Sequence, residues 1–386
     1  MSVLALTNIG KLVTGDIRNP VSKFNTIVVK DGKIAKVGNA DILKNFEVEK
    51  TVDAAGMTVS PGFIDSHVHT VLGDYTPRQK TQDYLSGATH GGVTTFISAG
   101  ECHTPGRPKD PAGTKALAIL AHKSFDNLRS SGLKVHGGGL ILEKGLVEAD
   151  FAEMAKEGVW LVGEVGLGSV KKPEDAKPMV EWAKKYGMKV AMHTGGTSIP
   201  GSSTVTADDV IAVQPTVVSH INGGPTAIAP QEIERLINTT DLTLEIVQCG
   251  NPKIANLVVR KLNEKGALQR LIFGNDSPSG TGIIPLGVLR TMSFVASMCG
   301  IPAEKVVAMA TGNTAKVYGL NTGLIEEGKD ADLVIMDAPM GSIASDALGA
   351  LEAGDLPGVA MVIVDGEIIV TKSRNTPPAT RKYTVK

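Results

Sequence analysis

The chain has 386 residues, with 39 Lys or Arg against 40 Asp or Glu, so its net charge is −1 at neutral pH. Balanced charge without a long block of one sign argues against nucleic acid and anionic membranes as partners. No apolar run reaches the length of a membrane span, and the first residues lack the basic segment of a signal peptide. Three widely spaced cysteines (Cys102, Cys249 and Cys299) predict a reducing compartment without a disulfide framework, so we expect a cytoplasmic protein.

Both ends of the chain have the alternating pattern of short β-strands. Residues 25–30 and 33–37 flank the turn Asp31-Gly32, which is typical of a hairpin. Residues 331–337 form a further candidate strand, and residues 362–370 predict a second hairpin around an Asp-Gly turn. We therefore expect residues 1–58 and 321–386 to form one small discontinuous sheet domain.

Between these ends, apolar runs of strand length alternate with amphipathic helical stretches such as 112–131 and 177–186. The eight predicted strands are residues 62–67, 94–99, 135–142, 159–165, 189–193, 217–220, 243–248 and 271–274. Continuously apolar strands separated by crossovers are typical of a parallel sheet covered by helices. The pattern predicts an α/β fold with a (β/α)₈ barrel over residues 59–320, and a doubly wound open sheet is the alternative.

Polar side chains capable of binding a metal follow several of these predicted strands. The first strand ends in His67-Val68-His69, and residues two apart in a strand point to the same face. The other candidates at strand ends are Glu164, His193, His220 and Asp276. The carboxyl ends of barrel strands form the active site in this kind of fold, so we expect the six side chains to meet there.

Four imidazoles and two carboxylates suit zinc or another late first-row divalent ion. Six ligands are too many for one ion that keeps a position for water. The set therefore predicts two divalent ions per chain that share a bridging carboxylate, with zinc expected and iron as an alternative for the second ion.

The sequence resembles the amidohydrolase superfamily over essentially its whole length. The matching pieces are Pro61–His69, His193, His220, Asp276 and the tail segment Gly323–Val334. The resemblance implies a distorted (β/α)₈ barrel with a β-sandwich built from both chain ends, and a homotetramer. It also implies a binuclear centre, with His67, His69 and Asp276 on one ion and His193 and His220 on the other.

One departure from the family concerns the bridging ligand. Cyclic-amide hydrolases of this family commonly use a carboxylated lysine on the fourth strand, where this chain has Glu164 and no lysine. We predict that Glu164 is the bridge, and Lys144, just past the third strand, is the weaker candidate.

The resemblance implies hydrolysis of a small cyclic amide, and the closest likeness within the family implies a six-membered lactam that carries a carboxylate. Asp276 is predicted to act as general base and then as general acid. Thr194, His103, Asn222 and Arg78 are predicted from their positions to contact the substrate. The alternatives are a cyclic amidohydrolase of dihydroorotase, hydantoinase or imidazolonepropionase type, and a catalytically silent member that acts as a binding or assembly protein.

Overall fold

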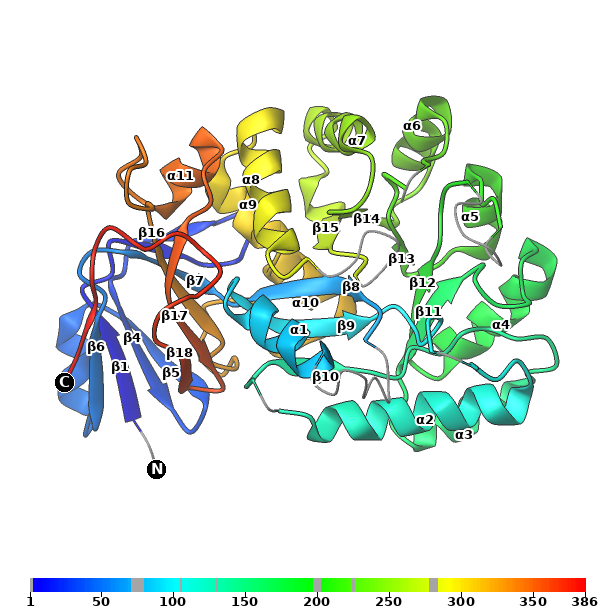
Figure 1. Cartoon of the computed structure of the whole chain (residues 1–386), viewed down its shortest axis with the longest axis horizontal. Helices are drawn as coiled ribbons and strands as arrows, with labels where there is room; N and C mark the ends of the chain where they lie inside the picture. The colour runs from blue at the N-terminus through cyan, green and yellow to red at the C-terminus, as the bar shows by residue number, and fades with distance from the viewer. Residues whose placement is uncertain are drawn as a thin grey trace.

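A computed structural model describes residues 3–70, 80–104, 106–129, 131–196, 203–223, 226–277 and 284–386. Strands from the two chain ends lie together on one side of the molecule, and the segment between them forms a ring of strands surrounded by helices (Figure 1). Within the described residues, no helix is long and apolar enough to cross a membrane.

Eight parallel strands form the ring. They are β8 (Phe63–Val68), β9 (Val93–Ser98), β10 (Lys134–His136), β11 (Leu161–Val165), β12 (Lys189–Met192), β13 (Val217–Val218), β14 (Thr243–Val247) and β15 (Leu271–Gly274). Regular hydrogen-bonded ladders join β8, β9 and β10 into one run of strands and β11 through β15 into another. Two single bridges close the ring, one between Val68 and Ser277 and one between Leu140 and Val162. The barrel expected from the sequence is therefore present.

Helices connect successive strands and cover the outside of the ring (Figure 1). They are α1 (Lys80–Thr89), α2 (Pro111–Asn127), α3 (Glu148–Lys156), α4 (Pro173–Lys185), α5 (Ala207–Val213), α6 (Pro230–Thr239), α7 (Pro252–Glu264), η2 (Leu268–Arg270), α8 (Gly287–Cys299), α9 (Ala303–Met309) and α10 (Gly312–Tyr318). Four of them begin with a proline, whose fixed φ suits the first helical position. In α2 the preceding Asp110 also accepts a hydrogen bond from the backbone N–H of Gly113, at 2.9 Å.

The two chain ends together supply two further sheets. One has the order β19 (Thr384–Val385), β6 (Lys50–Asp53), β1 (Val3–Thr7), β4 (Thr26–Lys30) and β5 (Lys33–Gly38), with η1 (Ala40–Asn45) after β5. The other has the order β18 (Glu367–Val370), β17 (Gly358–Val364), β16 (Leu333–Asp337), β7 (Thr58–Pro61), β2 (Lys11–Val13) and β3 (Val21–Ser22), and α11 (Ala347–Ala353) precedes β17. Leu6, Ile27 and Ile335 belong to a buried apolar cluster that both sheets share, and this cluster holds the sheets together.

Both predicted hairpins form at their Asp-Gly turns. Asp31 and Gly32 have φ values of 51° and 77°, and Asp365 and Gly366 have φ values of 49° and 79°. Two successive positive φ values are the geometry of the turn that best matches strand twist, and Asp-Gly adopts it at low cost.

Three barrel strands are shorter by two residues or more than the sequence predicts, and one of them is the fourth, where β11 begins at Leu161 and not at residue 159. The third was expected over residues 135–142, but β10 ends at His136 and only Leu140 rejoins the ring. The backbone leaves the strand conformation at Gly138, which has a φ of 81°, and glycine is required there because a Cβ would lie 2.4 Å from a carbonyl oxygen of α2. The sixth strand was expected to reach His220, but β13 ends at Val218 because the chain turns there, with φ of 31° at His220.

Candidate metal centre

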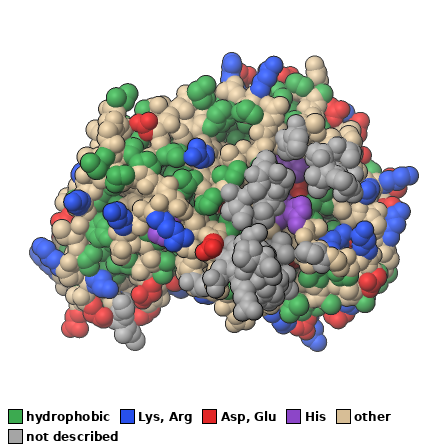
Figure 2. Space-filling view, in the orientation of Figure 1, with side chains coloured by type: hydrophobic (Ala, Val, Ile, Leu, Met, Phe, Trp, Pro, Cys, Tyr) green, Lys and Arg blue, Asp and Glu red, His purple; other side chains and the backbone are tan. Residues whose placement is uncertain are grey.

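The six predicted ligands meet at the carboxyl ends of the barrel strands. His67 is the penultimate residue of β8 and His69 lies just beyond it, Glu164 lies in β11, and the other three follow β12, β13 and β15. Each is at most 8% exposed. Histidine side chains are visible in the middle of the face in Figure 2, over the barrel. Residues more than 200 positions apart in the chain therefore converge on one buried site.

Four of the ligand atoms surround one point. The Nε2 atom of His67 lies 3.3 Å from Nε2 of His69, 3.5 Å from Oε2 of Glu164 and 3.6 Å from Oδ1 of Asp276. The Nε2 atom of His69 is 3.4 Å from each of the same two carboxylate oxygens. We call these four atoms the His67 cluster.

The His67 cluster has the dimensions of a cation site. The Nε2 atoms of His67 and His69 and the Oε2 atom of Glu164 lie 3.3–3.5 Å from one another, and three ligand atoms with this spacing, taken as one face of a regular tetrahedron, lie about 2.0–2.1 Å from its centre, the range of zinc–nitrogen and zinc–oxygen bonds. Two imidazole nitrogens and two carboxylate oxygens repel one another at these distances unless protons on the imidazoles or a cation between the four atoms supply positive charge. The residues present therefore fit a divalent cation.

A second group lies on the other side of Glu164. Its Oε1 atom is 2.5 Å from Nε2 of His220 and 3.6 Å from Nδ1 of His193, and these two imidazole nitrogens are 3.1 Å apart. We call these three atoms the His220 cluster. Each of the two histidines also has its other ring nitrogen buried without a hydrogen-bond partner among the described residues. Glu164 thus faces both groups, one oxygen to each.

The charge balance of the site also points to cations. Glu164, Asp276 and the neighbouring Glu245 are buried carboxylates, and within the described residues their ion-pair partners are all histidines, with no Lys or Arg among them. Burial opposes ionisation, but His67 and His220 hold the pKa of Glu164 well below its usual range. Buried negative charge of this kind requires a compensating positive charge.

The backbone turns that present the ligands are unusual. His220 and Asp276 have φ of 31° and 56°, a region that non-glycine residues seldom adopt. The N–H of Asp276 donates to the carbonyl of His67 at 2.8 Å, which ties the two strand ends together. Strained residues of this kind cluster at functional sites, where the surrounding structure holds them in place.

Three neighbours of the ligands were not predicted from the sequence. The Oε2 atom of Glu245, in β14, lies 2.7 Å from Nδ1 of His67. Cys102 Sγ is 3.3 Å from Nδ1 of His69, and Cys249 Sγ donates to Oδ2 of Asp276 at 3.2 Å. Burial opposes it, but His69 and His103 lower the pKa of the Cys102 thiol to about 6. A signal existed for Glu245, since it is an ionisable residue inside an apolar strand, and none for the two cysteines.

The predicted substrate contacts occupy different environments. Thr194 donates from Oγ1 to the carbonyl of Ser219 at 2.8 Å, and Asn222 is fully buried, with its amide paired to both backbone groups of Val247. These side chains hold strand ends together. His103 is exposed, with its ring 4.8 Å from that of His69. Arg78 lies outside the described residues.

Lys144 is remote from the two clusters. Its side chain is 66% exposed, and its Nζ atom forms an ion pair with Asp175 at 3.3 Å. A carboxylated lysine bridge would need this side chain at the buried centre of the barrel, so the geometry does not support the weaker candidate from the sequence.

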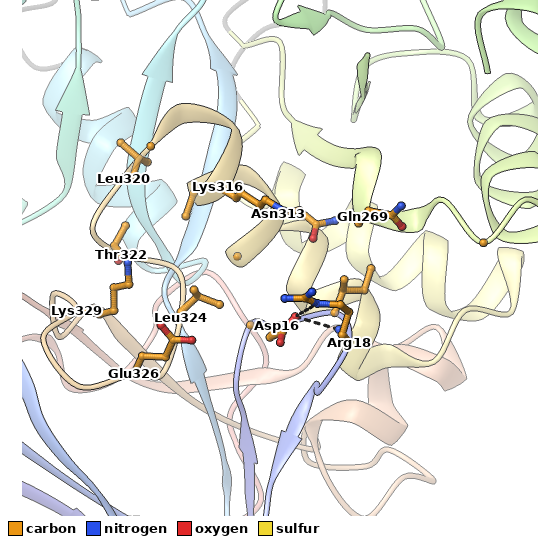
Figure 3. A pocket seen from close by; sticks show the side chains of 16 residues that line it. Asp16, Arg18, Gln269, Asn313, Lys316, Leu320, Thr322, Leu324, Glu326 and Lys329 are labelled. Carbon is orange, nitrogen blue, oxygen red and sulfur yellow. Dashed lines mark hydrogen bonds and ion pairs between the residues drawn. The ribbon is translucent and has the colours of Figure 1, made fainter. Parts of the chain in front are cut away.

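A cavity of about 770 Å³ lies at the other end of the barrel (Figure 3). Gln269, which precedes β15, lines it, whereas Asp276 follows the same strand. Asp16 and Arg18 form an ion pair at its edge, and none of the six predicted ligands lines it. We therefore assign the candidate site to the strand ends and not to this cavity.

The chain is an eight-stranded barrel with imidazoles and carboxylates gathered at its strand ends. This arrangement is typical of barrel proteins that bind divalent metals for hydrolysis. Residues 58–369 match the sequence profile of the amidohydrolase family. The chain belongs to this family.

Individual relatives narrow the comparison. The chain is 65% identical to enamidase of Eubacterium barkeri over 381 residues, which cover 99% of both proteins. A crystal structure of enamidase, described as a member of the amidohydrolase superfamily, superposes with a TM-score of 0.96 at 63% identity and full coverage of both chains. Imidazolonepropionase of Salinispora tropica is more distant, at 25% identity over 88% of this chain and 93% of the relative.

Proposed function

We propose that this chain is an enamidase. It is a hydrolase of C–N bonds in cyclic amides, and its substrate is 6-oxo-1,4,5,6-tetrahydronicotinate, which it converts to 2-formylglutarate and ammonia. The observation that carries the proposal is the 65% identity to the Eubacterium barkeri enamidase along 99% of both chains. Because the likeness is end to end, it includes the strand ends that form the metal centre. We place the reaction in nicotinate degradation.

We propose that two divalent cations bind per chain, zinc at one position and zinc or iron at the other. His67, His69 and Asp276 would hold one, His193 and His220 the other, and Glu164 both. The separation of the ligand atoms into two clusters, with one Glu164 oxygen facing each, supports this division. When bound, the cations lower the pKa of water and polarise the amide carbonyl.

The residues of the chain then position and move protons. Asp276 takes a proton from the attacking water and returns it to the ring nitrogen as the C–N bond breaks. Oδ1 of Asp276 faces the two histidines of the His67 cluster, while Cys249 donates to Oδ2 and fixes the plane of the carboxylate. The ring opens to an enamine, which tautomerises to an imine. A second water converts the imine to the aldehyde and releases ammonia.

Recognition of the substrate carboxylate requires a local group, because the net charge of −1 gives no global attraction for anions. Among the four predicted contacts, His103 is exposed beside His69, so its imidazole is the best placed to meet a carboxylate. Thr194, Asn222 and Arg78 remain predictions, and the first two already have partners within the fold.

The test is incubation of purified enzyme with the lactam. The absorbance of the conjugated enamide should disappear and one ammonia should be released per ring, while Asp276→Asn serves as the inactive control. Hydrolysis of dihydroorotate, a hydantoin or an imidazolone with the lactam untouched would contradict the enamidase assignment. A chain with two bound metals that hydrolyses none of these would show that the proposed substrate class is wrong, whereas a chain that binds no metal would support the silent binding protein.

We also propose that residues 1–58 and 321–386 form a discontinuous β-sandwich domain beside a barrel domain over residues 59–320. The two end sheets, which contain strands from both segments, support this division. A homotetramer in the cytoplasm is our proposal for the assembly, since the family favours tetramers and the three cysteines suit a reducing compartment. Light scattering of the purified protein tests the tetramer.

A further inference from the structure

We propose that Glu245 is a positioning residue that couples the two halves of the metal centre. It is not one of the six ligands, and it contacts one ligand of each cluster, His67 through its imidazole and His220 through its backbone. The inference rests on the proposed centre of two cations. It adds that loss of one carboxylate, outside both clusters, weakens both cation sites.

The first contact fixes the imidazole of His67. Oε2 of Glu245 lies 2.7 Å from Nδ1 of His67, whose Nε2 belongs to the His67 cluster. A carboxylate accepts only, so Nδ1 carries the proton and Nε2 presents a lone pair to a cation. The Oγ of Ser66 donates to the other oxygen of Glu245, so the orientation of the carboxylate is itself fixed.

The second contact holds the turn that carries His220. The N–H of His220 donates to the same Oε2 atom at 3.2 Å, and the N–H of Ile221 donates to the backbone carbonyl of Glu245 at 2.8 Å. His220 has a φ of 31°, which a histidine seldom adopts. An N–H left without its acceptor at this buried turn costs free energy, so the turn would relax and move the imidazole.

Within the described residues, the hydrogen bonds of the Glu245 carboxylate come from Ser66, His67 and His220. Its side chain is 0% exposed and it has no Lys or Arg within ion-pair distance. Burying a charge of this kind in the barrel is unfavourable unless hydrogen bonds and a nearby cation compensate for it. Its three donors and the adjacent ligands provide that compensation in one place.

Two substitutions separate the hydrogen bonds from the charge. Glu245→Gln keeps an oxygen that accepts from His67 and His220, and its NH₂ group can donate to Oγ of Ser66. Glu245→Ala removes every side-chain contact. Outer partners of metal ligands typically contribute about 10–100-fold in metal affinity. We expect Glu245→Ala to raise the dissociation constants of both cations at least ~10-fold, and Glu245→Gln to raise them less.

The experiment titrates the metal-free chain with Co²⁺ and Zn²⁺ against a chelating indicator. His69→Ala, which leaves the His220 cluster, and His193→Ala, which leaves the His67 cluster, isolate each site. Glu245→Ala should weaken the remaining cation in both backgrounds. Thr194→Val is the one-sided comparison, because Oγ1 of Thr194 donates to the carbonyls of Ser219 and His220. It should weaken only the His220 site.

Folding is monitored with a matched control. Asp332→Asn also changes a fully buried carboxylate, which accepts from Lys134 and Thr322 away from the metal ligands. It should lower the melting temperature and leave both dissociation constants unchanged. Glu245→Gln, which is isosteric, keeps the measurement possible if Glu245→Ala does not fold.

The outcomes separate the two proposals. If the unmodified chain binds two cations and Glu245→Ala binds both with unchanged affinity, the coupling is refuted and the enamidase proposal stands. Weakening in one background alone reduces Glu245 to a partner of a single ligand and also refutes the coupling. An unmodified chain that binds fewer than two cations overturns the binuclear centre and this inference together.

Discussion

The Oε1 atom of Glu164 lies 2.5 Å from Nε2 of His220, while the other oxygen of the same carboxylate faces the opposite pair of histidines. One short side chain thus reaches both ligand clusters without chemical modification. A carboxylated lysine, by contrast, forms only when carbon dioxide or bicarbonate is present.

The first prediction follows from this geometry. Metal-free enzyme reconstituted with zinc should recover the same kcat in bicarbonate-free buffer as in buffer with bicarbonate, because Glu164 supplies the bridge directly. The measurement is the initial rate after reconstitution in both buffers. Lys144→Ala should match the unmodified enzyme, since Lys144 is exposed and paired with Asp175. A strong bicarbonate requirement that Lys144→Ala abolishes would contradict the assignment of Glu164.

The second prediction concerns Asp276. Asp276→Asn should lower kcat by at least ~10²-fold, because a positioned general acid–base typically contributes 10²–10⁴-fold. The metal content of the same sample must be measured, since the carboxylate is also a ligand. Asp41→Asn, an exposed carboxylate in η1, is the control and should retain full activity. An Asp276→Asn enzyme with normal kcat would remove Asp276 from the proton transfers.

The third prediction concerns the metals. Elemental analysis should find about two transition-metal ions per chain, since six ligands exceed one open site. His67→Ala and His193→Ala should each lose activity and about one ion, because each ligand belongs to a different cluster. Removal of the metals by a chelator should lower the melting temperature, and added zinc should restore it, since bound ligands stabilise the folded state. Full activity with about one ion would disprove the binuclear centre.

The fourth prediction concerns Lys134, which joins the barrel to the end sheets. Its Nζ atom contacts Asp332 at 2.9 Å and Asp365 at 2.6 Å. Lys134→Met leaves Asp332 buried without its cation, and breaking a buried pair typically costs about 3–5 kcal/mol. Lys123→Ala breaks an exposed pair with Glu157 and should cost less than about 1 kcal/mol. Thermal unfolding measures the loss of stability in both variants, and equal small losses of stability would contradict the prediction.

Lys134 also makes the stability of the fold depend on pH in the alkaline range. Burial opposes it, but Asp332 and Asp365 raise the pKa of Lys134 to about 12, above the value of about 10.4 in an unfolded chain. The stabilisation is therefore fully present below pH ~10.4 and is lost as the pH rises toward 12. The difference in melting temperature between the unmodified chain and Lys134→Met should narrow over that window.

The fifth prediction concerns His136 at low pH. Burial, with a contribution from Lys134, lowers the pKa of His136 to about 4, against about 6.5 when unfolded. As the pH falls, His136 therefore binds a proton at a higher pH in the unfolded chain than in the folded chain. The free energy of unfolding decreases by up to about 3 kcal/mol as the pH falls from 6.5 to 4. His136→Asn should show a smaller loss of melting temperature between pH 7.5 and pH 5. Equal losses of melting temperature in the unmodified chain and in His136→Asn would contradict this prediction.

The sequence by itself determined the elements and which side chains are candidate ligands. Apolar runs of strand length and Asp-Gly turns depend on local periodicity and backbone preference, so β15 and both hairpins lie close to where they were predicted. The position of His67 and His69 at the end of a buried strand follows from the same local rules. The limit of these rules is visible just past β10, where Gly138 has a φ of 81° and lies so close to α2 that a Cβ would not fit.

Only the tertiary structure decided which groups surround the ligands. Glu245 lies 178 positions from His67 in the chain, and Cys249 lies 27 from Asp276, so neither contact is encoded by local spacing. Barrel closure brings β14 beside β15 and β15 beside β8, and the register of these ladders sets which side chains meet. A shift of one residue would turn Glu245 to the other face of its strand, because side chains alternate along a strand. The ligands are therefore set by sequence, and their orientation and charge balance by the register of the closed barrel.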